Sequence, residues 1–210
     1  MTPFYRTLYL IVGWFVKLIF NIRVVGKENQ PKKDDGPFII CANHISASDP
    51  VAIAVSLKHI QPYYMAKSQL FKNKFVSWFF RNLGCYPVNR DGNDVGALKT
   101  TLRLVKDGKS IGIFPQGTRH KGVDPRETKV RGGVGMICGY TGAKVLPIYI
   151  DTKDNITKMF RRRTVIIGKP ITPEEIAYVP RQAGEYERVS KLVFDRICDL
   201  GDEYKSKKKK

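Results

Sequence analysis

The chain lacks several patterns that define common kinds of site. Its cysteines stand far apart, without a CxxC pair or a Cys/His ligand spacing, at Cys41, Cys85, Cys138 and Cys198. This distribution gives no basis for a zinc site or a redox motif, and buried free thiols in a reducing cytosol account for it most simply. The glycine-rich fingerprints of dinucleotide-binding folds and P-loop proteins are also missing, which argues against nucleotide binding of those kinds.

Acidic residues are scarce. There are 19 Asp and Glu against 37 Lys and Arg, which gives a formal net charge of +18. Such an excess favours an anionic partner, namely a nucleic acid, an anionic membrane surface, a phosphorylated substrate or an acidic carrier protein. A basic module that only binds nucleic acid or a membrane is the weaker interpretation, because no signature of the common nucleic-acid-binding folds occurs and no basic stretch is interleaved with aromatic residues.

No apolar run reaches the ~20 residues that a helix needs to cross a bilayer. The most apolar segment, residues 4–22, contains Gly13, Trp14 and Lys17. Aromatic and basic residues in such a segment are typical of a helix that lies in the membrane interface, and a helix docked on the domain's own core is the alternative. We expect residues 1–22 to form an interfacial membrane helix, 23–204 one globular domain and 205–210 a basic tail.

Beyond residue 22, apolar runs of strand length alternate with helical patterns. The chain of 210 residues suits a single core, and the alternation predicts an α/β fold with a mainly parallel sheet flanked by helices. Pro147, inside the apolar run 145–150, indicates an edge strand or a bulge. The aromatic stripe between Phe75 and Leu83 fits either core packing or the floor of an acyl groove.

The most informative stretch is residues 38–50. A buried-strand pattern ends at Asn43 and His44, and Asp49 with Pro50 fits the cap and first position of a helix. A His at the carboxyl end of a strand lies where open α/β sheets bind their ligands. His44 and Asp49 can therefore face each other as a general base and its orienting carboxylate. A capping Asp beside an unrelated His is the structural alternative.

A second loop, FPQGTR at residues 114–119, also follows a strand pattern. With Asn43, His44 and Asp49 it resembles the NHxxxxD and FPEGTR motifs of the glycerolipid acyltransferases. Four further blocks of that family have counterparts in the same order, at residues 66–70, 84–90, 145–148 and 167–170. The resemblance covers most of the chain. It implies the family's α/β fold with a mixed, mainly parallel sheet, and makes 23–204 the acyltransferase domain.

The resemblance also implies a reaction. His44 would act as general base on the free sn-2 hydroxyl of 1-acylglycerol 3-phosphate (lysophosphatidic acid), which would attack an acyl thioester directly and give phosphatidic acid. Asp49 would orient the imidazole, and Asn43 would support the loop or the developing oxyanion. The donor would be a thioester of acyl-carrier protein or of coenzyme A, with no cofactor or metal. Glycerol 3-phosphate or another lysolipid is the alternative acceptor.

By the same resemblance, phosphate binding falls to Lys67, Arg119 and Arg90, with Gly117 and Thr118 letting the backbone approach. Gln116 stands where the family usually has Glu, which removes a negative charge beside the expected phosphate and leaves the acceptor open. The expected location is the cytoplasmic face of the cell membrane, with peripheral or monotopic attachment. An anionic leaflet attracts each nearby Lys or Arg by ~1 kcal/mol.

Overall fold

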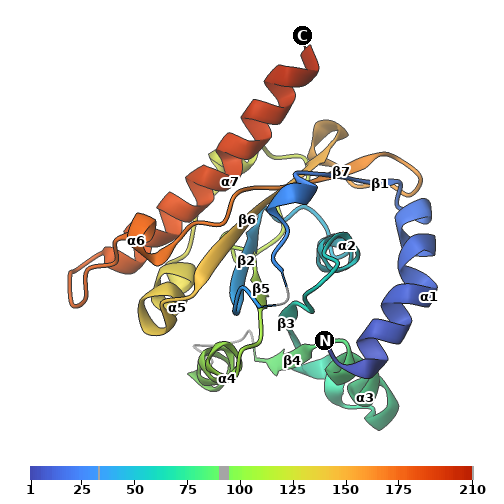
Figure 1. Ribbon diagram of the computed structural model, residues 1–210, viewed down its shortest axis with the longest axis horizontal. Helices are drawn as coiled ribbons and strands as arrows, with labels where there is room; N and C mark the ends of the chain where they lie inside the picture. The colour runs from blue at the N-terminus through green and yellow to red at the C-terminus, as the bar shows by residue number, and fades with distance from the viewer. Residues whose placement is uncertain (33, 90–94, 210) are drawn as a thin grey trace.

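The computed structural model describes residues 1–32, 34–89 and 95–209, which build one seven-stranded sheet with helices on both faces (Figure 1). The strands are β1 (Ile22–Val25), β2 (Phe38–Ala42), β3 (Tyr63–Lys67), β4 (Cys85–Val88), β5 (Ile111–Ile113), β6 (Lys144–Thr152) and β7 (Arg163–Ile167). The α-helices are α1 (Pro3–Ile19), α2 (Asp49–Ser56), α3 (Lys74–Asn82), α4 (Val95–Lys106), α5 (Gly133–Thr141), α6 (Pro173–Ile176) and α7 (Glu185–Lys209). Short 3₁₀ helices are η1 (Lys27–Asn29), η2 (Ser68–Phe71), η3 (Pro125–Glu127) and η4 (Lys153–Asn155).

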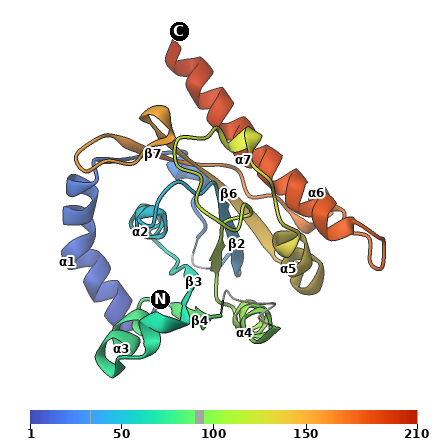
Figure 2. The same ribbon diagram turned by 180° about the vertical axis from the view of Figure 1, so that it is seen from behind.

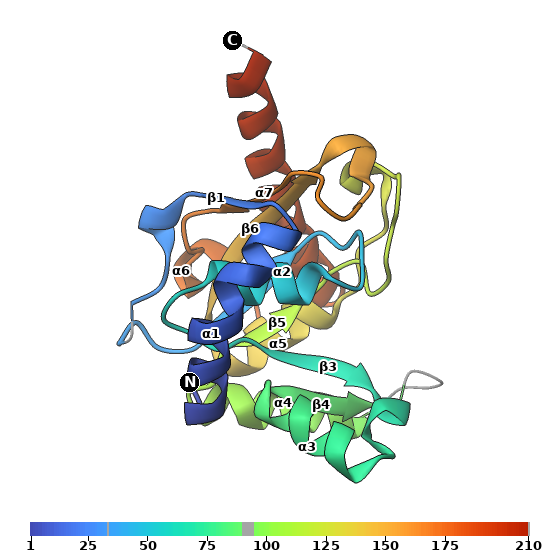
Figure 3. The same cartoon turned by 90° about the vertical axis from the view of Figure 1, so that its right-hand side faces the viewer.

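The sheet is mixed and mainly parallel, as the alternation of strands and helices predicted. Its order is β1-β7-β6-β2-β5-β3-β4. Strands β6, β2, β5, β3 and β4 run parallel to one another, whereas β7 runs antiparallel to β6 and is joined by β1. The carboxyl ends of β2, β5, β3 and β4 therefore meet at one edge of the sheet, and the arrowheads of β3 and β4 point toward it in Figure 3.

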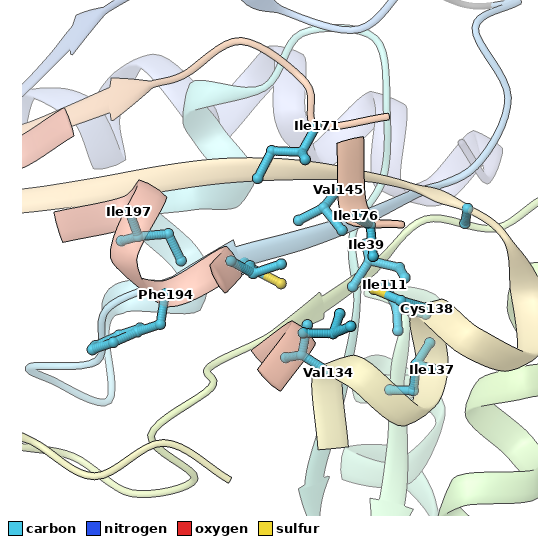
Figure 4. Close-up of a cluster of buried hydrophobic side chains, with 14 of the residues drawn as sticks. Ile39, Ile111, Val134, Ile137, Cys138, Val145, Ile171, Ile176, Phe194 and Ile197 are labelled. Carbon is cyan, nitrogen blue, oxygen red and sulfur yellow. The ribbon is translucent and has the colours of Figure 1, made fainter. Parts of the chain in front are cut away.

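Helices bury both faces of the central strands, so these strands are apolar throughout. Ile39 and Cys41 of β2 belong to the cluster under α5 and α7 (Figure 4), whereas Phe38, Ile40 and Ala42 belong to the cluster under α2. Successive residues of a strand point to opposite faces, which explains this division. Figure 2 shows α5 and α7 on the side of the sheet away from α1 and α2. The central strands thus give the loops at their carboxyl ends a rigid base.

Pro147 does not mark an edge, because β6 lies inside the sheet between β7 and β2. It does lie beside a bulge, because the antiparallel pairing shifts by one residue between Ile148–Ile167 and Val145–Ile171 and leaves an extra residue in the segment after β7. The proline is tolerated because its carbonyl oxygen, on the side facing away from β2, accepts from Gly168 N at 2.9 Å just beyond the β6–β7 pairing, which begins at Ile148. The missing N–H points to that same side, where the bulge interrupts the ladder.

The N-terminal helix α1 ends at Ile19, and residues 22–25 join the sheet as β1 instead of extending the helix. Thr2 caps the helix by accepting from Tyr5 N at 3.2 Å. The hydroxyls of Tyr5 and Tyr9 donate to the backbone of α2, at Ala54 O and Val55 O. Among the helices that the described residues form, none combines the length and apolar character needed to cross a membrane.

The C-terminal helix α7 continues through residues 205–209, so the expected basic tail is not separate from it. Lysine is a good helix former, no Gly or Pro follows Gly201, and cations are favourable at a helix C-terminus. Figures 1 and 3 show the last turns of α7 projecting beyond the rest of the molecule.

Candidate active site

Two neighbouring strands, β2 and β5, bring the two motif loops together. The loop after β2 carries His44, and the loop after β5 runs from Phe114 past Gln116. His120 N donates to His44 O at 2.9 Å, which ties the second loop directly to the first. Residues 70 positions or more apart in the sequence, such as His44 and Phe114, thus form one site because parallel strands end at the same edge.

The expected pair of His44 and Asp49 is formed. His44 Nδ1 lies 2.9 Å from Asp49 Oδ2, and the same oxygen accepts from Ile45 N and Ser46 N, each at 2.7 Å. Because the carboxylate only accepts, Nδ1 carries the hydrogen and the lone pair of Nε2 is left available. The His44 side chain is 15% exposed and that of Asp49 is fully buried, so the imidazole alone reaches solvent.

Asp49 is not the helix cap that the sequence suggested. Ser48 is the N-cap, and Asp49 is the first residue of α2, followed by Pro50. Its carboxylate turns back to the preceding loop, where it accepts the backbone N–H groups of Ile45 and Ser46. The helix start therefore serves to hold the carboxylate under the imidazole.

Asn43 and Gln116 are both buried braces. Asn43 pairs with the backbone of Ile150 in both directions, at 2.7 Å and 3.1 Å, so its side chain supports the loop and is not available to an oxyanion. Gln116 Oε1 accepts from His44 N at 2.6 Å, and Gln116 Nε2 donates to Thr128 Oγ1 at 2.8 Å. Gln116 is 3% exposed, so it does not face a bound phosphate as the sequence interpretation assumed.

An aromatic stack fixes the plane of the imidazole. The rings of His44 and Phe114 lie 3.9 Å apart between centroids with an interplanar angle of 13°, and Tyr64 continues the stack at 6.1 Å from Phe114. The Tyr64 ring covers Gly112 of β5, where a Cβ atom would lie 2.0 Å from it. Burial raises the pKa of Tyr64 well above its usual range, so its hydroxyl is neutral. This stack was not predicted from the sequence, although Phe114 directly precedes Pro115 in the motif loop.

The expected phosphate ligands lie at neighbouring strand ends. Lys67 is the last residue of β3, and Gly117, Thr118 and Arg119 follow β5; all four are exposed. Within the described chain, neither Lys67 nor Arg119 has a hydrogen-bond or ion-pair partner for its cationic group. Arg90 lies outside the described residues.

Gly117 has φ +71°, which favours glycine, and it lets another cation approach. A Cβ atom there would lie 2.8 Å from Arg131 Cδ. Arg131 N also donates to Pro115 O at 2.9 Å, so this exposed arginine belongs to the same loop cluster. It is an additional cation of the site that the sequence analysis did not assign.

An apolar cavity of about 330 Å³ begins beside the His–Asp pair. Ala47 and Pro50 line it next to the pair, and it continues between α1, α2, β3 and the end of α3. This volume is at the lower end of the ~300–1,000 Å³ of ligand pockets. Cys85 also lines the cavity, but burial raises the pKa of its thiol to about 11, so the thiol is not ionised at neutral pH.

These features define an α/β domain with a His–Asp pair, cations at the adjoining strand ends and an apolar pocket. Among the described residues, no group of three or more His, Cys, Asp or Glu is arranged to hold a metal ion.

The acyltransferase family model matches residues 21–151, which include both motif loops, and the chain belongs to this family. A 1-acyl-sn-glycerol-3-phosphate acyltransferase of Bacillus subtilis is 29% identical over 162 residues, covering 76% of this chain and 78% of the relative. A protein of the same name from Borreliella burgdorferi is 35% identical over 138 residues, covering 64% of this chain but only 53% of the relative.

The fold also has a solved counterpart. The crystal structure of the 1-acyl-sn-glycerophosphate (LPA) acyltransferase PlsC from Thermotoga maritima aligns with a TM-score of 0.64 and 25% identity, covering 94% of this chain and 78% of that one. The family resemblance of the sequence is thereby confirmed, together with its mainly parallel α/β fold.

Proposed function

We propose that the protein transfers an acyl group from an acyl thioester to the free sn-2 hydroxyl of 1-acylglycerol 3-phosphate, producing phosphatidic acid. The observation that carries this proposal is the apolar cavity that starts at Ala47 and Pro50, beside the His44–Asp49 pair. An acceptor with an acyl chain suits this arrangement better than glycerol 3-phosphate, which has no apolar part to bury. The names of the relatives agree with this choice.

His44 acts as the general base. Its Nε2 takes the hydroxyl proton while the hydroxyl oxygen attacks the thioester carbonyl carbon. The carbon–sulfur bond then breaks, and the leaving sulfur receives the proton, which gives phosphatidic acid and a free thiol. Asp49 stabilises the imidazolium that forms between these steps. A positioned base contributes typically ~10²–10⁴ in rate.

Lys67, Arg119 and Arg131 bind the acceptor phosphate, with Gly117 and Thr118 allowing the loop to approach it, and Arg90 is a further expected ligand. The support is positional, since Lys67 ends β3 and Arg119 follows the neighbouring strand β5. Their lack of protein partners within the described chain leaves both cations available to an anion. Arg offers a bidentate fork to a phosphate, and Lys a point charge.

The enzyme works at the cytoplasmic face of an anionic membrane, to which it attaches peripherally or monotopically through α1. The outer face of α1 exposes five large apolar side chains, between 50% and 66%, at Leu10, Ile11, Trp14, Phe15 and Leu18. Phe4 contacts Trp78 of α3 at 5.2 Å between ring centroids, and Trp78 and Phe75 are also exposed. We name these seven exposed residues the apolar strip. A strip of this size suits burial in lipid.

A cationic pocket next to the apolar strip supports attachment to an anionic membrane surface. It has a volume of about 460 Å³, and its lining contains four cations and no acidic residue, with Lys17, Arg23, Lys27 and Lys58 as the cations. Burial, together with the charges of Lys58 and Lys27, lowers the pKa of Lys17. A phosphate headgroup bound in this pocket would offset the repulsion among its four cations. An acidic acyl-carrier protein would be attracted by the same net charge of +18.

The test is transfer of a labelled acyl chain to lysophosphatidic acid, with acyl-carrier protein and coenzyme A thioesters as donors, in wild type and His44→Ala. We expect activity in the wild type and a loss of at least roughly a hundredfold in the variant. Glycerol 3-phosphate and other lysolipids serve as comparison acceptors. Preference for one of these would refute the acceptor, and activity retained by His44→Ala would refute the base.

A further inference from the structure

Arg163, the first residue of β7, is a buried cation at the site with few hydrogen bonds. It is 2% exposed, and its side chain makes one hydrogen bond, from Nη2 to Ser48 Oγ at 2.9 Å. Its Nε and Nη1 atoms have no partner among the described residues. Burial lowers the pKa of this guanidinium, and the charge of Asp49 acts in the opposite direction. Buried polar groups are normally paired, so this arrangement requires an explanation.

The guanidinium lies directly behind the carboxylate of the His–Asp pair. Arg163 Nη1 is 3.7 Å from Asp49 Oδ1, the oxygen that accepts no hydrogen bond in the described structure. On another side the guanidinium lies over the ring of Phe20, 5.5 Å from its centroid. The Arg163 backbone is paired with Ile22 and Thr152 on both sides, so the charge is held in place by the sheet.

Stability alone does not account for this charge. A buried ion pair is often no better than well-packed apolar residues of similar volume, especially when its hydrogen bonds are incomplete. Its position beside Asp49 points instead to the charge state and orientation of the base. A positive charge this close to the pair opposes protonation of both the carboxylate and the imidazole.

We propose that Arg163 is a positioning residue that keeps Asp49 ionised and aimed at His44, and so extends general-base activity to lower pH. This inference rests on the proposed role of His44. Loss of the charge favours protonation of either member of the pair, and either event removes the base. Arg163 is only 2% exposed, so its effect falls on the pH range of activity and not on substrate binding.

Several other titratable or charged groups lie near the His44–Asp49 pair, and substitutions of Arg163 leave them unchanged. The titratable or charged groups on the strand ends and loops beside the pair include Tyr64 and Lys67 of β3, and Arg119, His120 and Arg131 from the loop after β5. Of these, only Tyr64 is buried like Arg163, and it is neutral, because burial raises its pKa. Arg163 is therefore the buried cation on which the comparison depends.

The experiment measures kcat/KM against pH for wild type, Arg163→Met, Arg163→Gln and Arg163→Lys. Arg196→Met, an exposed arginine of α7, controls for the loss of one positive charge. We expect both neutral variants to move the acid side of the profile upward by at least about one pH unit, which is roughly tenfold in rate there. Activity on the alkaline plateau and KM for the acceptor should change by less than about threefold, and Arg163→Lys should restore most of the shift.

A second readout does not depend on acyl transfer. The imidazole resonances of the three histidines can be followed by NMR during a pH titration, and the midpoint of His44 should rise in Arg163→Met and Arg163→Gln but not in Arg196→Met. An unchanged midpoint, or a uniform loss of rate at every pH, would overturn the role of Arg163. A raised midpoint in a protein that acylates none of the lysolipids would instead support Arg163 and refute the proposed reaction.

Discussion

Replacing Asp49 with Asn isolates the negative charge of the His–Asp pair. Three N–H donors converge on Asp49 Oδ2, from His44 Nδ1, Ile45 N and Ser46 N. In the Asn variant the amide oxygen takes the same position, because it can accept hydrogen bonds from these three donors and an NH₂ group cannot. The imidazole therefore keeps its tautomer, and the amide NH₂ turns toward Arg163. The variant loses the charge but keeps the orientation.

The size of the effect follows from this geometry. A hydrogen bond to a charged group contributes ~1.5–3 kcal/mol, which corresponds to a loss of about 10- to 150-fold in kcat. Asp49→Ala removes the acceptor as well and leaves the imidazole and two backbone N–H groups unpaired. We expect it to lose at least roughly another tenfold.

The assay is kcat and KM of acyl transfer to lysophosphatidic acid on the alkaline plateau, with circular dichroism to confirm folding of each variant. KM should stay within about threefold of wild type, since Asp49 is fully buried. Equal losses in the Asn and Ala variants would show that the backbone donors do not hold the amide oxygen. A fully active Asn variant would show that the charge of Asp49 is not used.

Three further changes test the cavity, the apolar strip and the loop. Ala54→Phe narrows the cavity one helical turn beyond Pro50, and should reduce transfer with long-chain substrates at least about tenfold more than with short-chain ones, measured across a chain-length series. Trp14→Ser with Leu18→Ser should weaken sedimentation with anionic liposomes by at least about tenfold, while leaving transfer to a detergent-dispersed acceptor unchanged within about threefold. Gly117→Ala, at φ +71° and against Arg131, should raise KM for the acceptor more than it lowers kcat, in steady-state kinetics.

The sequence was sufficient for the sheet and for the His–Asp pair because both depend on short-range patterns. The runs that became β2, β5 and β6 are continuous and apolar, as strands covered on both faces require. His44 and Asp49 are separated by five positions, so one loop brings them together. Pro147 indicated an edge or a bulge, and only the bulge is present, because a proline in a strand pattern does not distinguish an edge strand from an inner strand beside a bulge.

The parts of the site that the sequence did not reveal come from distant segments. Arg163 is 114 residues from Asp49 and reaches it only because β7 returns antiparallel beside β6. Its sequence context, two exposed arginines before a strand, looks like an ordinary solvated charge run. Thr128 and Arg131 similarly depend on how the long loop after β5 folds back. A pattern of single residues cannot specify such contacts.

Gln116 is the clearest case in which the structure changes an interpretation. At the sequence level, Gln in place of the usual Glu removed a charge beside the phosphate, and acceptor choice stayed open. In the fold both ends of its amide are occupied inside the protein, by His44 N and Thr128 Oγ1. Its amide therefore joins the two motif loops.

This role gives a prediction that distinguishes support of the two motif loops from recognition of the acceptor. Gln116→Glu keeps the acceptor for His44 N, and Thr128, which now donates to Pro125 O at 2.6 Å, can turn its hydroxyl to the new carboxylate at a cost of about one hydrogen bond, ~1 kcal/mol. The ratio of kcat/KM between lysophosphatidic acid and glycerol 3-phosphate should then stay within about threefold of wild type. Gln116→Leu, which cannot join the loops by hydrogen bonds, should lower kcat/KM for both acceptors by a similar factor. If Gln116→Glu alone changed the preferred acceptor, residue 116 would belong to the substrate site. Its buried side chain would then have to become exposed when the substrate binds.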